Sequence, residues 1–229
     1  MSNRTTPESR AKPLKRPTQA RARFTVQAIF DAYVRIWQRD GWAGLTTRAV
    51  ALEAGVAVGT LYDYFPSKEA LHSAYVRHCI ERLVEAVDAQ VVQAPALSWQ
   101  QRIHLLIELL SGVRRDELSW FHPDMMELEP LVAEQKYQLR AYAELLAMWR
   151  RVLGVCTDLP QPADDRLVEA LHLAVWGGRR YAMQLRLDDR QMQSWAAEME
   201  ALCVARLGGS AAPVTDPSAA ERPDSFPSR

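Results

Sequence analysis

Apolar side chains recur at intervals of three and four residues along most of the chain, which is the spacing of amphipathic helices. No segment shows the alternation of a half-buried strand. Glycine, proline and aspartate signals, among them Glu129-Pro130, divide the pattern into helices. About nine are expected, near residues 18–39, 47–54, 58–64, 68–94, 98–115, 123–129, 131–153, 164–187 and 189–207. The pattern predicts an all-α fold.

Two short helices around residue 55 are joined by a tight turn. Thr46 is placed to cap the first helix with its side-chain oxygen, and Leu45 and Val50 have the spacing of a hydrophobic staple. Gly55 ends that helix, because glycine tolerates the left-handed backbone that such a turn requires. This arrangement predicts a helix-turn-helix, whose second helix, residues 58–64, would lie in the major groove of DNA.

The residues after this motif favour contact with an anion. Pro66 disfavours helical backbone at Phe65 and so ends the second short helix, and Ser67 can cap the next one. Lys68 then falls at a helix start, where a cation opposes the helix dipole at a cost of about 0.3–1 kcal/mol. A DNA phosphate would reverse that balance, so Lys68 suits a bound state better than a free one. A solvated lysine is the alternative.

Composition divides the chain into four parts. Residues 1–20 are expected to form a basic arm, which either reaches the minor groove of DNA or adds nonspecific attraction. Residues 21–67 form the three-helix helix-turn-helix domain, and residues 68–207 a larger helical domain. Residues 208–229 form a tail that buries too little apolar surface to order itself.

Charge separates the two ends of the chain, although the net charge is zero. Residues 1–80 contain 12 Lys and Arg against 6 Asp and Glu; the whole chain has 28 of each, so residues 81–229 contain 16 against 22. The end that carries the helix-turn-helix is therefore positive, which favours a polyanion as its partner.

Other classes of protein find little support in the sequence. No apolar run reaches the roughly 18 residues of a spanning helix, and no signal-peptide apolar stretch follows the basic N-terminus. Cys79, Cys156 and Cys203 are odd in number and far apart, which indicates buried thiols in a reducing compartment. His122 near Asp124 suits a polar helix start better than a metal site. We therefore expect a cytoplasmic protein that is no enzyme, enters no membrane, and carries no metal or cofactor.

Three runs of residues carry a resemblance to a known family. They are Gly44-Leu-Thr-Thr-Arg48, Ala54-Gly-Val56 and Gly59-Thr-Leu-Tyr-Asp-Tyr-Phe-Pro-Ser-Lys-Glu-Ala-Leu71. With them, the segment from Arg21 to Val76 resembles the DNA-binding domain of TetR-family (TetR/AcrR-like) transcriptional regulators. Gly-Thr-Leu-Tyr followed by Tyr-Phe-x-x-Lys is a specific signature, and the resemblance covers about a quarter of the chain.

The resemblance implies a role for each matching residue. Phosphate contacts are implied for Thr47, Arg48, Tyr64 and Lys68. Base or groove contacts are implied for Val58, Gly59, Thr60 and Tyr62. Two residues depart from the family pattern, Ala57 where a serine cap is common and Val58 where a polar or basic residue is common, and they favour apolar contact with thymine methyls. Asp63 either points sideways or accepts a hydrogen bond from a cytosine amino group.

Two apolar stripes near the C-terminus suggest self-association, with small residues that let helices approach closely. In the family that the chain resembles, such a helix pair meets its twin in a four-helix bundle. The expected interface residues are Leu171, Ala174, Val175, Gly178, Trp195, Met199 and Leu202. The alternative is that both stripes belong to the core of one chain.

Large adaptable side chains in the middle of the chain can line a pocket for an apolar or aromatic molecule. The candidates are Trp99, Ile103, Trp120, Phe121, Met125, Tyr142, Met148, Trp149 and Trp176. The alternative for each of them is ordinary core packing.

The sequence thus favours a homodimeric repressor that binds a palindromic operator in double-stranded DNA and is released by a small-molecule effector. The alternative is a DNA-binding architectural or protein-regulated factor without such an effector.

Overall fold

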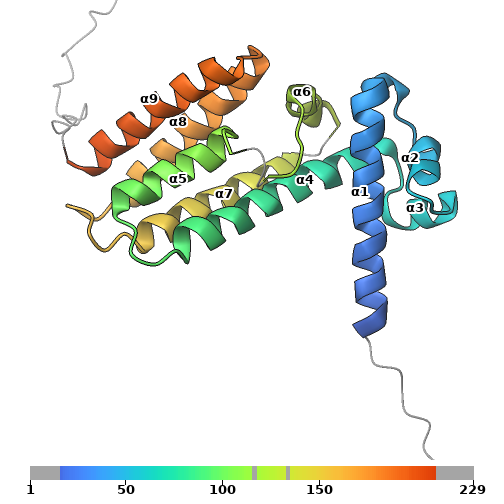
Figure 1. Ribbon diagram of the computed structural model, residues 1–229, viewed down its shortest axis with the longest axis horizontal. Helices are drawn as coiled ribbons and strands as arrows, with labels where there is room; N and C mark the ends of the chain where they lie inside the picture. Colours follow the sequence, from blue (N-terminus) through green and yellow to red (C-terminus); the bar gives the residue numbers. More distant parts are fainter. Residues whose placement is uncertain (1–15, 115–117, 133–134, 210–229) are drawn as a thin grey trace, which may run out of the picture. The chain divides into compact units, whose positions relative to one another are not determined.

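The computed structural model describes residues 16–114, 118–132 and 135–209, and all regular structure within them is helical (Figure 1). The helices are α1 (Arg16–Gly44), α2 (Thr47–Glu53), α3 (Val58–Tyr64), α4 (Lys68–Val87), the π-helix η1 (Asp88–Val92), α5 (Trp99–Ser111), α6 (Pro123–Val132), α7 (Gln135–Gly154), α8 (Asp165–Gln184) and α9 (Asp189–Leu207). The predicted all-α fold is confirmed. None of these helices is both long and apolar enough to cross a bilayer.

Helix ends follow local signals in most places. Gly41, with φ of 64°, kinks α1 where the first helix was expected to stop. Gly112, with φ of 76°, ends α5 at Ser111, before the expected end at residue 115. Both glycines adopt the left-handed backbone that other residues avoid.

The break predicted at Glu129-Pro130 is wrong, because α6 runs through Pro130 to Val132. A proline inside a helix removes one backbone hydrogen bond. Met125 is fully buried in the core and Leu128 packs against it, so tertiary packing holds this segment helical despite the proline.

The described residues form two compact units. The first contains α1, α2, α3, α4 as far as Glu81, and the segment 120–139 with α6. Its core includes Leu61 and Phe65, so these two side chains face inward. The core side chains around them include Ile29, Phe30, Tyr33, Ile36, Trp37, Leu45, Val50, Leu71, Tyr75 and Met125. This unit exceeds the expected domain of residues 21–67 because the segment around α6 completes its core.

Three polar side chains, Tyr33, His72 and Glu129, lie close together among these apolar ones. The Tyr33 hydroxyl and Nδ1 of buried His72 share a hydrogen bond of 2.7 Å, and Nε2 of His72 lies 3.3 Å from Oε2 of Glu129. Burial raises the pKa of Tyr33, which keeps its hydroxyl protonated. The Tyr33–His72 hydrogen bond links α1 to α4, and Glu129 of α6 lies close to the other ring nitrogen of His72.

The second unit comprises the described residues of segments 82–119 and 140–209. Within it α5 contacts both α8 and α9, and Gly178 of α8 lies so close to Trp195 of α9 that an added Cβ would be 3.0 Å from the indole ring. Buried Arg102 of α5 donates to the carbonyls of Val91 and Ala94, which lie at the end of η1 and just after it. The π-helix and α5 are thus joined by charge-assisted hydrogen bonds.

Candidate nucleic-acid interface

The helix α2 is fixed by its N-terminal cap and its apolar face. The Thr46 side chain accepts a hydrogen bond from the Ala49 N–H at 3.1 Å, as expected. Leu45, Val50 and Ala51 are fully buried, so α2 is anchored on the core of the first unit. Its remaining faces stay available for contacts outside the unit.

The turn between α2 and α3 depends on Gly55. Its φ of 68° lies in the left-handed region, and the N–H of Val56 then bonds to the carbonyl of Ala51 at 3.0 Å. Val56 packs against the core and so fixes the turn. The sequence predicted the glycine at this turn correctly.

The helix α3 buries one large side chain and exposes the others. Leu61 is fully buried, whereas Val58, Tyr62 and Tyr64 are 39%, 48% and 39% exposed. Gly59 is exposed and has no atom within 4 Å of the position of an added Cβ. Large apolar and aromatic side chains exposed in this way are typical of a surface that binds a partner.

The first residues of α2 lie beside the exposed face of α3. The Thr47 hydroxyl hydrogen-bonds to the Tyr62 hydroxyl at 3.0 Å, which ties the two helices together through two of the predicted residues. Arg48 is exposed, and Thr60 is partly buried. The structure therefore brings residues predicted for phosphate contact next to residues predicted for base contact.

Lys68 lies at the start of α4 and has an aromatic partner that the sequence did not reveal. Its Nζ lies 4.2 Å from the centre of the Trp42 ring, in the geometry of a cation–π interaction. Ser67 caps α4 as expected, because its Oγ accepts from the Ala70 N–H at 3.1 Å. Trp42 thus positions the ammonium of Lys68. Nothing in the local sequence pattern pairs the two residues, which are far apart along the chain.

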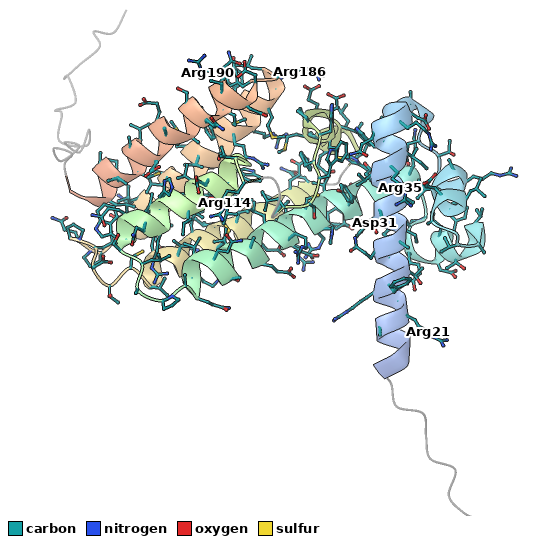
Figure 2. All side chains as sticks on the ribbon, in the orientation of Figure 1. Arg21, Asp31, Arg35, Arg114, Arg186 and Arg190 are labelled. Carbon is teal, nitrogen blue, oxygen red and sulfur yellow. The ribbon has the colours of Figure 1, made fainter. Side chains whose placement is uncertain are left out.

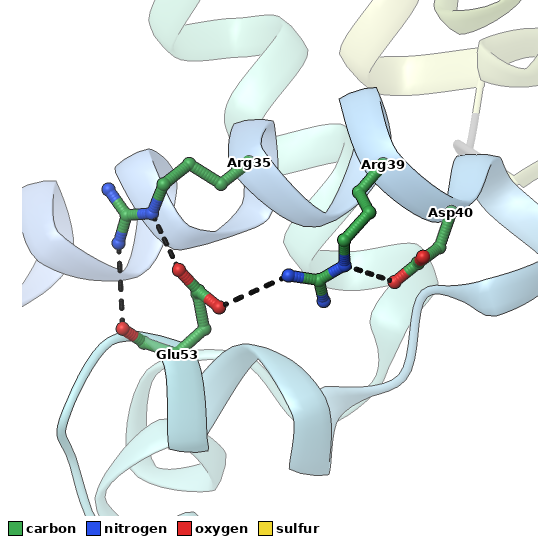
Figure 3. A network of polar contacts seen from close by, with 4 residues as sticks. All are labelled: Arg35, Arg39, Asp40 and Glu53. Atoms are coloured by element: carbon green, nitrogen blue, oxygen red, sulfur yellow. Dashed lines mark hydrogen bonds and ion pairs between the residues drawn. The ribbon is translucent and has the colours of Figure 1, made fainter.

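A polar network fastens α2 to α1 (Figure 3). Glu53 pairs with Nε of Arg35 at 2.8 Å and with Nη1 of Arg39 at 3.6 Å, and Arg39 also pairs with Asp40 at 3.0 Å. The hydrogen bond from Arg35 lowers the pKa of Glu53, and the hydrogen bond with Asp40 raises the pKa of Arg39. These two arginines are occupied by carboxylates, so they orient α2 and are not the groups that we assign to phosphate.

Other basic side chains lie on the N-terminal half of α1, where Arg21 is exposed (Figure 2). Arg23 of the same helix is exposed as well. The remaining positively charged residues of the predicted arm, among them Arg10, Lys12 and Lys15, lie outside the described residues. The predicted tail does too from residue 210 onward.

The residues predicted to line a ligand pocket belong to both units. In the first unit Met125 is buried, and Trp120 and Phe121 pack partly buried against the same core. In the second unit four side chains are buried and two are half-buried. The buried ones are Trp99, Ile103, Met148 and Trp149, and the half-buried ones are Tyr142 and Trp176.

The residues predicted for the dimer interface divide by exposure. Leu171 and Val175 are buried within the second unit, and Gly178 packs on Trp195 of the same chain. Ala174 and Leu202 are exposed, and Met199 is half-buried. A row of exposed apolar residues lies on another face of α8. It consists of Leu173, Gly177 and Tyr181, and continues at Leu185 just after the helix, one every fourth residue.

Cys156 and Cys203 are buried, and His122 makes a local hydrogen bond at the start of a helix. Burial raises the pKa of Cys156 to about 11 and of Cys203 to about 12, so both thiols stay protonated at neutral pH. Nδ1 of His122 accepts a hydrogen bond from the Asp124 N–H at 3.2 Å, at the start of α6. Among the described residues no cluster of three or more His, Cys, Asp or Glu side chains could hold a metal ion.

Comparison with known proteins finds similarity to bacterial regulators over part of the chain. Residues 29–75 match the model of the family described as bacterial regulatory proteins, tetR family. Over 91 residues, 39% of this chain, it is 34% identical to the HTH-type transcriptional repressor KstR of Rhodococcus jostii, and over 90 residues 42% identical to KstR of Mycolicibacterium smegmatis. The chain spans 41% and 44% of the length of these two relatives.

The fold is shared over a longer stretch. The transcriptional regulator FadR of Bacillus subtilis, in complex with stearoyl-CoA, superposes with a TM-score of 0.57. The superposition covers 78% of this chain and 97% of FadR, at 16% sequence identity. At that identity the likeness concerns the fold alone.

Proposed function

We propose that this chain, whose residues 29–75 match the model of the tetR family of bacterial regulatory proteins, is a sequence-specific DNA-binding repressor that a small apolar or aromatic molecule releases from its operator. The observation that carries this proposal is the exposed face of α3. Val58, Gly59 and Tyr62 are exposed on that face, while buried Leu61 packs the opposite side of the helix into the core.

The chemistry of the surface suits DNA in two ways. Thr47, Arg48, Tyr64 and Lys68 offer hydroxyl and cationic donors to phosphates on either side of α3. Val58 and the methyl group of Thr60 suit thymine methyl groups, and Gly59 lets the backbone approach the base edges. The Thr47–Tyr62 hydrogen bond keeps the phosphate-binding and base-reading helices in register.

Repression and response to a ligand are supported by the relatives. The two KstR proteins are transcriptional repressors, and the B. subtilis regulator of the same fold binds stearoyl-CoA. In this chain the large side chains of the second unit, among them Ile103, Met148 and Trp149, would surround the ligand. The place of action is the cytoplasm, because that is where a bacterial operator lies.

A homodimer through α8 and α9 would supply the second reading helix that a palindrome requires. The exposed apolar stripe of α8 ends near Tyr181 and Leu185, and Leu202 of α9 is also exposed. Gly177 in the middle of the stripe leaves room for a partner helix to approach closely.

Selection of bound genomic fragments with the purified full chain tests the proposal directly. We expect a few palindromic sites at near-physiological salt, and we expect Tyr62→Ala to lose them while Tyr137→Ala, an exposed tyrosine of α7, retains them. Diffuse recovery without a motif would favour an architectural factor. No recovery at low salt would refute the assignment to DNA.

A further inference from the structure

Two polar side chains are buried in the second unit without a protein partner for their ring nitrogens. His172 of α8 is 1% exposed and Trp149 of α7 is fully buried. Nδ1 and Nε2 of His172 and Nε1 of Trp149 have no hydrogen-bond partner among the described residues. Buried polar groups in folded proteins are nearly always hydrogen-bonded, so these atoms indicate a polar partner from outside the chain.

Two contacts between α7 and α8 show how the helices that carry these residues pair. The Tyr142 ring of α7 is 5.2 Å from the His172 ring, and the Tyr142 hydroxyl donates to Glu169 of α8. Further along, Arg150 of α7 pairs with Asp165 of α8 at 2.9 Å. The two contacts fix an antiparallel register.

Trp149 lies on α7 between Tyr142 and Arg150, the two residues that contact α8. It follows Tyr142 by two helical turns and therefore shares its face of α7. Side chains in a helix lean toward its N-terminus, so Trp149 leans toward Leu145 and His172 leans toward Val168, positions that oppose each other in this register. Leu145, Met148, Val168 and Leu171 are all buried there, so the surroundings of the three nitrogens are apolar.

The charges around His172 and Trp149 indicate that the ligand group bound there is uncharged. Burial lowers the pKa of His172, so the imidazole is neutral at pH 7 and offers one donor and one acceptor, while the indole offers a donor only. Glu169 is the charged group that acts on His172, which disfavours an anion. A cation would find no acceptor at Trp149, and any ion would lose its hydration in these surroundings.

We infer that Trp149 and His172 hydrogen-bond the oxygen of an uncharged, otherwise apolar ligand, an alcohol or a ketone. A carbonyl oxygen accepts from the indole N–H and from the imidazole N–H. A hydroxyl oxygen accepts from the indole N–H in the same way, and its own hydrogen can be donated to the imidazole nitrogen that carries no hydrogen when that nitrogen faces it. This assignment rests on the proposed function, because it identifies the polar end of the effector that the repressor would bind.

Three probes of equal chain length test the inference on the full chain: octanol, methyl hexyl ketone and octane. The readout is the indole N–H resonance of Trp149 in isotope-labelled protein, identified by its loss in Trp149→Phe. We expect octanol and the ketone to move this resonance downfield and to bind about tenfold or more tightly than octane. This measurement on the wild-type chain does not depend on the folding of any variant.

Two histidine variants supply the matched comparison. His172→Phe should bind all three probes alike, whereas His104→Phe, at a half-exposed histidine of α5, should retain the preference for oxygen. Equal binding of the three probes to the wild type, no binding at all, or an indole resonance that no probe moves would overturn the inference. The last outcome would mean that a buried water only occupies the site.

Release of operator DNA is measured separately, so that the two failures can be told apart. If octanol moves the Trp149 resonance and the operator stays bound, ligand-controlled repression fails and the site stands. If octane releases the operator as well as octanol does, and His172→Phe responds like the wild type, the site fails and repression stands.

Discussion

A few side chains fix the position of α3 and determine which of its groups are exposed. Ala57 precedes the helix and provides no side-chain cap, where the family pattern favours serine. The helix is instead fixed from below by buried Leu61 and from the side by the bond between Thr47 and Tyr62. The hydroxyl of Tyr62 is therefore both a structural tie and part of the exposed face, so we expect its removal to disturb the proposed DNA recognition in both ways.

Lys68 is the residue whose contribution to DNA binding is easiest to isolate. We expect Lys68→Ala to weaken binding to every DNA sequence and to reduce the slope of log affinity against log salt by about one, because one phosphate contact is lost. Trp42→Leu should lower affinity while keeping that slope, since the charge remains and only its positioning is lost. Titrations of labelled operator DNA at several salt concentrations measure both effects.

The chain contains a matched control for this prediction. Lys136 of α7 also stacks on an aromatic ring, with its Nζ 4.9 Å from the centre of Tyr137, and it lies away from the helix-turn-helix in sequence. Lys136→Ala should leave affinity and slope unchanged. If it weakens binding as much as Lys68→Ala, the effect is one of net charge and Lys68 has no special position.

Among the helices and turns, features set by neighbouring residues were predictable from the sequence. The Thr46 cap, the left-handed Gly55 and the Ser67 cap each depend on a few adjacent residues, and the structure has all three. The helix break expected at Glu129-Pro130 is wrong because the conformation there depends on residues that are distant in the sequence. Packing of Met125 on a core formed by distant residues keeps α6 helical through the proline.

Pairings between distant side chains could not be predicted. The Trp42–Lys68 contact and the Arg35–Glu53 ion pair join residues 26 and 18 positions apart, and no local pattern specifies such partners. The faces of α8 show the same limit, because the helix carries two apolar stripes. Only tertiary packing decides that Leu171 is buried and Leu173 is exposed.

Gly55 and Gly59 separate stability from recognition within the helix-turn-helix. Gly55→Ala should lower the free energy of unfolding by about 1 kcal/mol, because φ of 68° is unfavourable for alanine. Gly59→Ala lies in α3 with open space around it, so stability should be kept or rise by about 0.5 kcal/mol while operator affinity falls. Denaturant unfolding and DNA titration check the pair. Loss of stability in Gly59→Ala, or unchanged DNA affinity, would contradict our placement of that glycine against the duplex.

The contact between α5 and α9 should give stability a pH dependence. His104 pairs with Glu200 at 2.8 Å, and this hydrogen bond raises the pKa of His104. A raised folded-state pKa means that the stabilisation is fully present below the unfolded-state pKa and is lost as pH rises through the folded-state pKa. His104→Gln should therefore cost more stability at about pH 6 than at about pH 8, and less than about 1 kcal/mol because the pair is half exposed. Unfolding curves at both pH values test this, and equal costs would contradict it.

For the molecule as a whole, one helix-turn-helix reads only half of a palindrome. Two recognition helices must be held about one DNA turn apart, roughly 34–36 Å, to read both halves together. A second chain held through α8 and α9 would provide this spacing, and any ligand that alters the second unit could alter the spacing as well. Operator affinity should therefore depend on residues far from α3.

Charged substitutions on α8 and α9 test whether a dimer forms through these helices. In the double variant Tyr181→Glu/Leu202→Glu, two side chains that are 62% and 56% exposed in the single chain become charged. Helicity should be unchanged, because neither side chain packs in the core, but light scattering should report half the mass of the wild type. Affinity for the palindrome should fall at least about a hundredfold, toward that for one half-site, because the second contact is no longer intramolecular. Leu131→Glu, at an even more exposed leucine of α6, should keep both mass and affinity. A double variant that remains dimeric would show that the partner binds elsewhere, since two buried glutamates in an apolar helix pair would not be tolerated.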